Sequence, residues 1–232
     1  MLYLARFSIL DGEVRDEARW ADFFPHSSKQ DLEPSDLCVL VEPALPGSEE
    51  FCDQLVEAIG QLYHQRKLSL SGGLLRAFQA ANLQLREWNR KSFKEHRIAA
   101  GVSALALTDN MAYLAQVGPA LAFARQQSAQ TARPEVQRLE PNIPEAMQPL
   151  GLDDEFWPSF FALPFQQGSS LLLLTSELGS LLDDQEVNEI MSQPPDTVLT
   201  LLQPRVRQID GCSAVLIART DDLEDLDEDT GD

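Results

Sequence analysis

Hydrophobic residues along the chain change their spacing several times, and helical spacing occurs in four stretches. Behind Ser48, apolar residues recur every three or four positions as far as Leu62, which predicts an amphipathic helix over 48–64 with Ser48 as its cap. A similar stripe predicts a second helix over 70–90. Two shorter helices are expected near 183–191 and 196–207.

Short apolar runs bounded by turn residues predict β-strands. The run at 36–41, ended by Glu42, and the run at 169–175 are continuously apolar, which is typical of strands buried on both faces. Thr-Asp-Asn and Gly-Pro separate three further runs and predict consecutive antiparallel hairpins. These runs are 99–107, 111–117 and 120–125, and a last strand is expected at 213–219.

The order of these elements predicts an α+β fold, an αββα sandwich of two antiparallel sheets flanked by helices. Residues 1–219 would form this one domain. The stretch 126–168 holds six of the fourteen prolines and little periodicity, so it predicts surface loops. A division into two domains would need a break near 126–148, but the strands on either side are too few for independent sheets.

The charge of the chain is strongly negative, with 37 Asp and Glu against 18 Lys and Arg and a formal net charge of −19. This balance disfavours binding to nucleic acid. Eight of the carboxylates lie in the last twelve residues, which contain no cation, so 220–232 is predicted to be a disordered tail or an interdomain linker. A linker would also fit a domain cut from a longer protein, and the sequence leaves this open.

Two further features concern location and redox state. No stretch reaches the roughly 18 apolar residues that a membrane span needs, and the N-terminus lacks the order of a signal peptide, which favours a cytoplasmic protein. The three cysteines share no CxxC spacing, so they indicate buried reduced thiols rather than a zinc site or a disulfide framework.

Seven short motifs follow one another in a single order. They are Val41-Glu-Pro43, Ala77-Phe-Gln-Ala-Ala-Asn82, Gly101-Val-Ser-Ala104, Val117-Gly-Pro-Ala-Leu121, Pro149-Leu-Gly151, Leu173-Leu-Thr-Ser-Glu-Leu178 and Asp210-Gly-Cys-Ser-Ala-Val-Leu-Ile217. In this order and spacing they resemble the metal-dependent type 2C Ser/Thr protein phosphatases, the PPM family, from about residue 4 to 219. The resemblance implies the αββα sandwich and, in intact members, two Mn or Mg ions that activate a shared water for attack on a phosphoester.

The metal-binding motifs depart from the family pattern. Glu42 stands where the family has its bridging aspartate, and Pro43 replaces the neighbouring glycine. Glu177 stands at the aspartate of the Ser-Asp-Gly motif, Asp210 retains the final aspartate, and Pro119 replaces the turn aspartate. Because these cations require oxygen ligands at short, near-octahedral distances, a longer side chain or a missing ligand changes the site. The resemblance leaves Glu42, Glu177 and Asp210 as the candidate metal ligands.

The N-terminal segment Gly12-Glu-Val-Arg15 resembles the part of the family pattern that carries a phosphate-binding arginine. Arg15 would retain that role. Arg19 and Trp20 then stand at the family's acidic pair, so a metal-ligand glutamate has become a cation. Three readings stay open for the carboxylates: strand-end residues without a role, a residual single-metal site, or an internal ion pair in which Arg19 replaces the metal charge.

These departures predict a catalytically degenerate, pseudophosphatase-like domain that holds a kinase, a phosphoprotein or another signalling protein, with no cofactor or with one weakly bound Mn or Mg. The alternative is an active Mn- or Mg-dependent Ser/Thr phosphatase with an altered centre. A structural domain of a larger assembly is a third reading, and the oligomeric state is open. The N-terminal nucleophile hydrolases share the layer order, but the chain begins Met1-Leu2-Tyr3 and offers no Thr, Ser or Cys as first residue.

Overall fold

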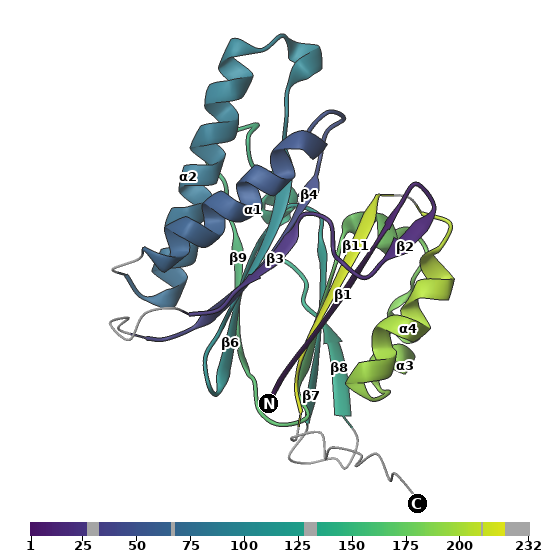
Figure 1. Ribbon diagram of the computed structural model, residues 1–232. Coiled ribbons are helices and arrows are strands. Elements are labelled where there is room, and N and C mark those ends of the chain that lie inside the picture. The colour runs from purple at the N-terminus through teal and green to yellow at the C-terminus, as the bar shows by residue number, and fades with distance from the viewer. Residues whose placement is uncertain (27–32, 66–67, 128–133, 210, 221–232) are drawn as a thin grey trace, which may run out of the picture.

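A computed structural model describes residues 1–26, 33–65, 68–127, 134–209 and 211–220. The described residues form two antiparallel sheets covered by helices on both outer faces, so the αββα prediction is confirmed (Figure 1). Asp210 and 221–232, which belong to the predicted site and the predicted tail, lie outside the described residues. None of the described helices is long and apolar enough to cross a membrane.

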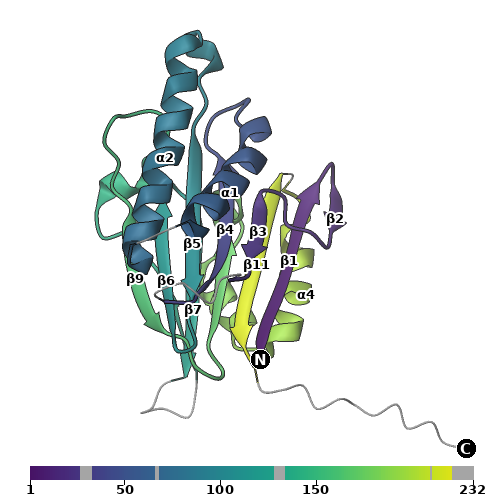
Figure 2. The same ribbon diagram turned by 60° about the vertical axis from the view of Figure 1, so that its left-hand side comes forward.

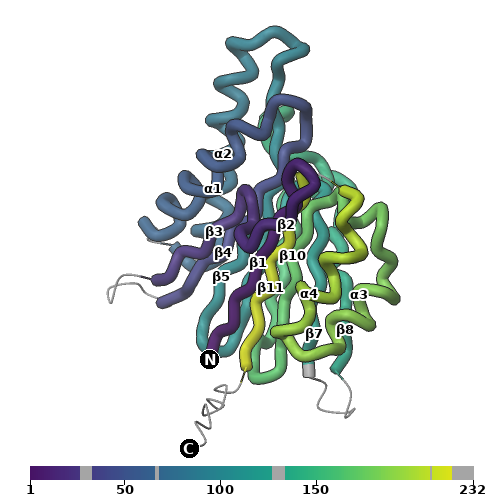
Figure 3. Tube along the Cα trace, turned by 45° about the vertical axis from the view of Figure 1, so that its right-hand side comes forward, coloured from purple at the N-terminus to yellow at the C-terminus, as the bar shows by residue number. Residues whose placement is uncertain are grey.

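The first sheet has six strands in the order β2-β1-β11-β10-β7-β8. Their bounds are β1 Leu2–Leu10, β2 Glu13–Arg15, β7 Leu121–Gln127, β8 Pro134–Arg138, β10 Ser170–Leu174 and β11 Cys212–Arg219. The helices α3, Asp184–Met191, and α4, Pro195–Val206, cover its outer face (Figure 3). Asp183 and Glu186 form a capping box that starts α3, while Pro195 is tolerated in the first turn of α4.

The second sheet has five strands in the order β3-β4-β5-β6-β9. Their bounds are β3 Ala21–Phe24, β4 Asp36–Pro43, β5 Ala100–Leu107, β6 Met111–Val117 and β9 Ser159–Pro164. The helices α1, Glu49–His64, and α2, Leu70–Lys91, pack on its outer face, and Figure 2 shows the two sheets with these helices on one side. Short 3-10 turns η1 Lys94–His96, η2 Pro144–Met147 and η3 Ser176–Ser180 connect the elements.

The core lies in three layers, one between the sheets and one under each helix pair. Alternation along β4 explains the division, because Val39 and Val41 face α1 and α2 while Cys38 and Leu40 face the other sheet. Both sheets contain strands from either side of 126–148, so the chain does not divide into separate sheets there.

Several local predictions were wrong. The runs 111–117 and 120–125 form no hairpin, because Gly118 and Pro119 carry the chain from the second sheet to the first. The stretch 126–168 contains β8 and β9 in addition to loops, and β1, β2 and β3 were not predicted. Ser48 occupies the first position before α1, but its Oγ accepts a 3.0 Å hydrogen bond from the Ala99 N–H instead of capping the helix.

Two of the sequence motifs meet in space. The Oδ1 atom of Asn82 on α2 accepts a 2.7 Å hydrogen bond from the Gly151 N–H, and its Nδ2 donates to the carbonyl of Asp153 at 3.1 Å. Gly151 has φ +101°, and a Cβ there would lie 2.9 Å from both the Ile98 carbonyl oxygen and the Leu85 Cβ. The Asn and Gly of these motifs therefore lock the loop after β8 to α2.

Candidate functional site

Glu42 lies at the end of β4 on the side that faces the other sheet, because it alternates with Val41, which faces the helices. Only 1% of its surface is exposed. Gly101 on β5 is its partner in the sheet, and a Cβ at Gly101 would come within 2.9 Å of Glu42 Oε1. The glutamate side chain thus fills the space that the glycine leaves free.

The carboxylate of Glu42 joins the two sheets. Its Oε2 accepts a 2.6 Å hydrogen bond from the backbone N–H of Ser176, the residue that begins η3 after β10. Its Oε1 is buried and has no hydrogen-bond partner among the described residues. The pKa of Glu42 is raised from 4.5 to about 7: burial raises it most, the Ser176 hydrogen bond partly opposes this, and the negative charge of Glu177 adds to the rise. Near neutral pH a large fraction of this carboxyl group holds a proton.

Glu177 follows Ser176 and is exposed on η3. Its charge acts on Glu42, so the structure brings these two predicted metal ligands into one electrostatic neighbourhood. The third, Asp210, lies outside the described residues. Within the described ranges, no group of three Asp, Glu, His or Cys side chains is arranged to hold a metal ion. The three-carboxylate site stays a prediction.

Several described residues depart from what a two-metal centre needs. Such a centre needs a charged bridging carboxylate with free oxygens, whereas Glu42 gives one oxygen to Ser176 and holds a raised pKa. Pro119 follows Gly118 in the crossing between the sheets and has no side-chain oxygen. Gly118 has φ +92°, and a Cβ there would lie 2.6 Å from the Gly101 Cα. The backbone around Glu42 is therefore closely packed.

Arg19 is the residue that one of the three open readings paired with Glu42. Its guanidinium carbon lies 4.2 Å from the centre of the Trp20 ring, a cation–π contact. Among the ion pairs of the described residues there is none between Arg19 and Glu42. The carbonyl of Arg19 accepts a 2.8 Å hydrogen bond from Ser213 Oγ, which fixes this loop to β11.

Trp20 has a left-handed backbone, φ +58°, which is rare for a bulky residue. It is 3% exposed, and its carbonyl accepts a 2.8 Å hydrogen bond from the Val41 N–H next to Glu42. The Trp20 Nε1 has no hydrogen-bond partner among the described residues. Trp20, which the resemblance aligns with the family's acidic pair, is therefore a buried aromatic residue beside the end of β4.

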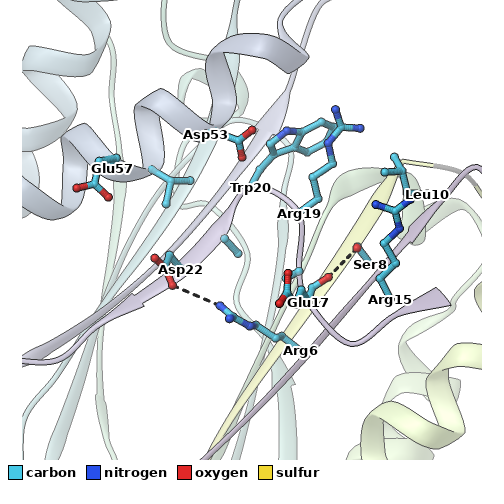
Figure 4. A pocket seen from close by; sticks show the side chains of 13 residues that line it. Arg6, Ser8, Leu10, Arg15, Glu17, Arg19, Trp20, Asp22, Asp53 and Glu57 are labelled. Atoms are coloured by element: carbon cyan, nitrogen blue, oxygen red, sulfur yellow. Dashed lines mark hydrogen bonds and ion pairs between the residues drawn. The ribbon is translucent and has the colours of Figure 1, made fainter. Parts of the chain in front are cut away.

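A cavity of about 480 Å³ lies at the open edge of the sandwich, between β1, β3 and α1 (Figure 4). Arg15 and Arg19 both line it, so the structure brings together the predicted phosphate-binding residue and the predicted substitute cation. The other lining residues are Arg6, Ser8, Leu10, Glu17, Ala18, Trp20, Ala21, Asp22, Asp53, Val56 and Glu57. Glu42 and Glu177 are not among them.

Sequence reasoning missed a charge pair in this cavity. Arg6 on β1 and Asp22 on β3 lie 3.4 Å apart and bridge the edges of the two sheets, as Figure 4 shows. Ser8 Oγ donates a 2.6 Å hydrogen bond to the carbonyl of Glu17, which positions the segment between Arg15 and Arg19. The strands β1 and β3 were not predicted from the sequence, and it is their position in the fold that brings Arg6 opposite Asp22.

Comparison with solved structures defines the class of fold. The chain has the fold of bacterial type 2C-like serine/threonine phosphatases. It matches the serine/threonine phosphatase Stp1 from Staphylococcus aureus with TM-score 0.72 and 13% identity, over 95% of this chain and 96% of that chain. The serine/threonine phosphatase from S. agalactiae gives TM-score 0.71 and 12% identity, over 94% and 100% of the two chains.

Another match is the catalytic domain of the phosphatase PstP in complex with two manganese ions, with TM-score 0.66 and 14% identity over 95% of this chain and 99% of that chain. PppA, a regulatory component of the type VI secretion system in Pseudomonas aeruginosa, gives TM-score 0.63 and 15% identity over 94% and 97%. No family model and no curated protein sequence matches the chain significantly. At such low identities the likeness concerns the fold.

Proposed function

We propose that this chain is a catalytically degenerate, pseudophosphatase-like domain that acts by binding a signalling protein, either a kinase, a phosphoprotein or another regulator, through the former catalytic face. The observation that carries the proposal is the state of Glu42. It is buried, it is held by the Ser176 N–H, and its pKa is raised to about 7, so it is a poor ligand for a divalent cation.

The surroundings of Glu42 support the same conclusion. Pro43 and Pro119 carry no side-chain oxygen, and the resemblance places Arg19 at a position where the family has a metal-ligand glutamate. We propose no cofactor, or at most one weakly bound Mn or Mg near Glu42, Glu177 and Asp210. The net charge of −19 argues against nucleic acid as the partner. A cytoplasmic location is part of the proposal.

Arg15 is the proposed phosphate-binding residue of this face. It is exposed and lines the same cavity as Arg6 and Arg19, and, unlike Arg6, it forms no ion pair among the described residues, so its guanidinium group can meet a phosphate group of a partner. PppA, a regulatory component of a secretion system, is a precedent for a regulatory protein with this fold. We therefore propose that a phosphorylated segment binds this face and is not hydrolysed.

The first test is calorimetric titration of the chain with manganese and with magnesium, together with a phosphoester hydrolysis assay. The proposal expects weak or no metal binding and no metal-dependent turnover. Manganese-dependent turnover that Glu42→Ala abolishes and Glu135→Ala, at an exposed position on β8, preserves would overturn it. The second test is titration with a phosphoserine peptide in the presence of EDTA, where Arg15→Ala should lose binding and Arg207→Ala should keep it.

An active phosphatase with an altered centre is the second candidate. The neighbour PstP was solved with two manganese ions, and Glu42 and Glu177 lie close enough to interact. A single cation between them would require Glu42 to lose its proton and its bond to Ser176. The manganese titration separates the two candidates, because metal binding by the active enzyme would release a proton and depend steeply on pH.

A further inference from the structure

The end of α2 and the turn after it carry a local positive charge in an acidic chain. Residues 86–97 contain five cations and two glutamates, a formal charge of +3. The rest of the chain carries −22, which gives the net charge of −19. The cations are Arg86, Arg90, Lys91, Lys94 and Arg97. An acidic ligand is attracted here and repelled over most of the remaining surface.

Three of these cations surround a small cavity. Arg86, Arg90 and Arg97 line about 140 Å³ together with Asn89, Gly151 and Leu152. The only carboxylate near them in an ion pair of the described residues is Asp154, which pairs with Arg86 and lies 4.0 Å from Arg90. Asn89 donates to the carbonyls of Ile98 and Gly151 at 2.8 Å, so the floor of this cavity is fixed. Positive charge therefore exceeds negative charge around it.

Apolar side chains flank the same helix end. Phe93 is 77% exposed and Trp88 is 49% exposed. Large apolar side chains that are exposed side by side often mark a binding surface. The ring centres of Trp88 and Phe51 lie 4.7 Å apart, and Trp88 lines an apolar groove of about 310 Å³ between α1 and α2. Arg, Trp and Phe are enriched in protein interfaces. Arg86, Trp88, Arg90, Phe93 and Arg97 together are called the α2 surface below.

The chain itself contains a segment of complementary chemistry. Residues 221–232 hold eight carboxylates, no cation, and two leucines, Leu223 and Leu226. The carboxylates match the arginines around the small cavity, and the leucines match the neighbouring apolar groove. The α2 surface therefore has a candidate ligand within this sequence.

The geometry favours a second copy over the same copy as the source of that segment. Thr220 is held by two hydrogen bonds to Met1, and Arg219 lines the same cavity as Leu70, the first residue of α2. Arg90 lies twenty residues further along α2, about 30 Å at 1.5 Å per residue. Within the same copy, the seven residues from Thr220 to Asp227 extend to about 25 Å at most, so both leucines and the first five carboxylates of the segment fall short of Arg90, and only 228–232 could reach it.

Figure 1 agrees with this estimate, because the described chain ends beside the N-terminus while α2 runs away from it to the opposite end of the molecule. We propose that the α2 surface binds the acidic segment 221–232 of a second copy of this chain. Each copy then offers one segment and one surface, so two copies can close a symmetric pair. This association does not involve the former catalytic face.

The test is sedimentation analysis of the full chain over a concentration series at low and high salt. We expect reversible dimerisation that high salt weakens, because the contacts are between exposed charges. The double variant Arg90→Glu with Arg97→Glu should weaken dimerisation at least about tenfold. The matched control, Arg205→Glu with Arg207→Glu at the exposed end of α4, makes the same change of charge elsewhere and should leave dimerisation in place.

A complementation experiment tests the pairing directly. A second variant of the full chain replaces five acids of the segment by amides: Glu224→Gln, Asp225→Asn, Asp227→Asn, Glu228→Gln and Asp229→Asn. It should be monomeric alone, as should the Arg90→Glu, Arg97→Glu variant, yet a mixture of the two should form a heterodimer through the one intact surface and the one intact segment. A wild-type chain that stays monomeric, or a mixture that forms no heterodimer, would overturn the proposal.

Discussion

The Glu42 carboxylate accepts a 2.6 Å hydrogen bond from the Ser176 N–H, and this bond connects the five-stranded sheet to the six-stranded sheet. One oxygen of Glu42 is thereby satisfied, while the other is buried against Gly101 without a hydrogen-bond partner among the described residues. A buried carboxyl group with one unpaired oxygen is more stable protonated than ionised. The pH dependence of stability should therefore reveal the state of Glu42.

Glu42→Gln removes the ionisable group and keeps an oxygen for the Ser176 bond. In the wild type the pKa rises from 4.5 to about 7 on folding, so stability falls as pH rises through this window and the loss is complete above pH 7. The free energy of unfolding of the variant should thus increase relative to the wild type by about 3 kcal/mol between pH 4 and pH 8. Urea denaturation at a series of pH values measures the difference.

The matched control is Glu135→Gln, which removes an exposed carboxylate on β8. Its stability relative to the wild type should change far less over the same pH range, because an exposed carboxylate is not desolvated. A difference between Glu42→Gln and the wild type that stays constant with pH would mean that Glu42 ionises as it does in the unfolded chain.

The sequence predicted the elements that carry strong local patterns. The helices α1 and α2 have long apolar stripes, and β10 has four consecutive leucines, so burial dictates both the pattern and the structure. The strands β8 and β9 escaped prediction for physical reasons. The edge strand β8 has a polar sequence, Pro-Glu-Val-Gln-Arg, and β9 ends in proline and follows another.

The local sequence pattern did not predict which strands pair with each other. The Gly-Pro between β6 and β7 looks like a hairpin turn, yet β7 pairs with β8 and β10 in the other sheet. In the candidate site, the resemblance pointed to Glu42 and Glu177. The hydrogen bond from Ser176 to Glu42 could not be predicted, because its donor is a backbone N–H and depends on no particular side chain. An ion pair of Arg19 with Glu42 was one of three open readings, and the guanidinium group of Arg19 instead lies over the Trp20 ring.

Gly118 should tolerate no side chain. A Cβ at this position would lie 2.6 Å from the Gly101 Cα, and the backbone has φ +92°, so Gly118→Ala combines a steric clash with an unfavourable backbone. We expect a loss of about 2–4 kcal/mol in the free energy of unfolding, measured by chemical denaturation. Gly47→Ala is the control, because it has φ +83° but no atom within 4 Å, and it should cost about 1 kcal/mol. Equal losses at both positions would contradict the close packing beside Glu42.

Asn82→Ala should destabilise the protein by about 2–3 kcal/mol, because it leaves the Gly151 N–H and the Asp153 carbonyl without their partner in a site where Asn82 is 3% exposed. Thermal or chemical denaturation measures the loss. Asn188→Ala, at an exposed position on α3, is the control and should change stability by less than about 0.5 kcal/mol. A small effect at Asn82 would mean that the loop does not depend on this amide.

The cysteines should be inert towards thiol reagents in the folded protein. Cys38, Cys52 and Cys212 are all buried and form no disulfide, as the sequence predicted. Burial raises the pKa of both Cys38 and Cys52 to about 12, so almost no reactive thiolate forms at neutral pH. Titration with a chromogenic disulfide reagent should detect no thiol in native buffer and three in denaturant. A thiol that reacts rapidly in native buffer would indicate that the layer containing it opens, and Cys38→Ser, Cys52→Ser and Cys212→Ser made one at a time would identify which layer.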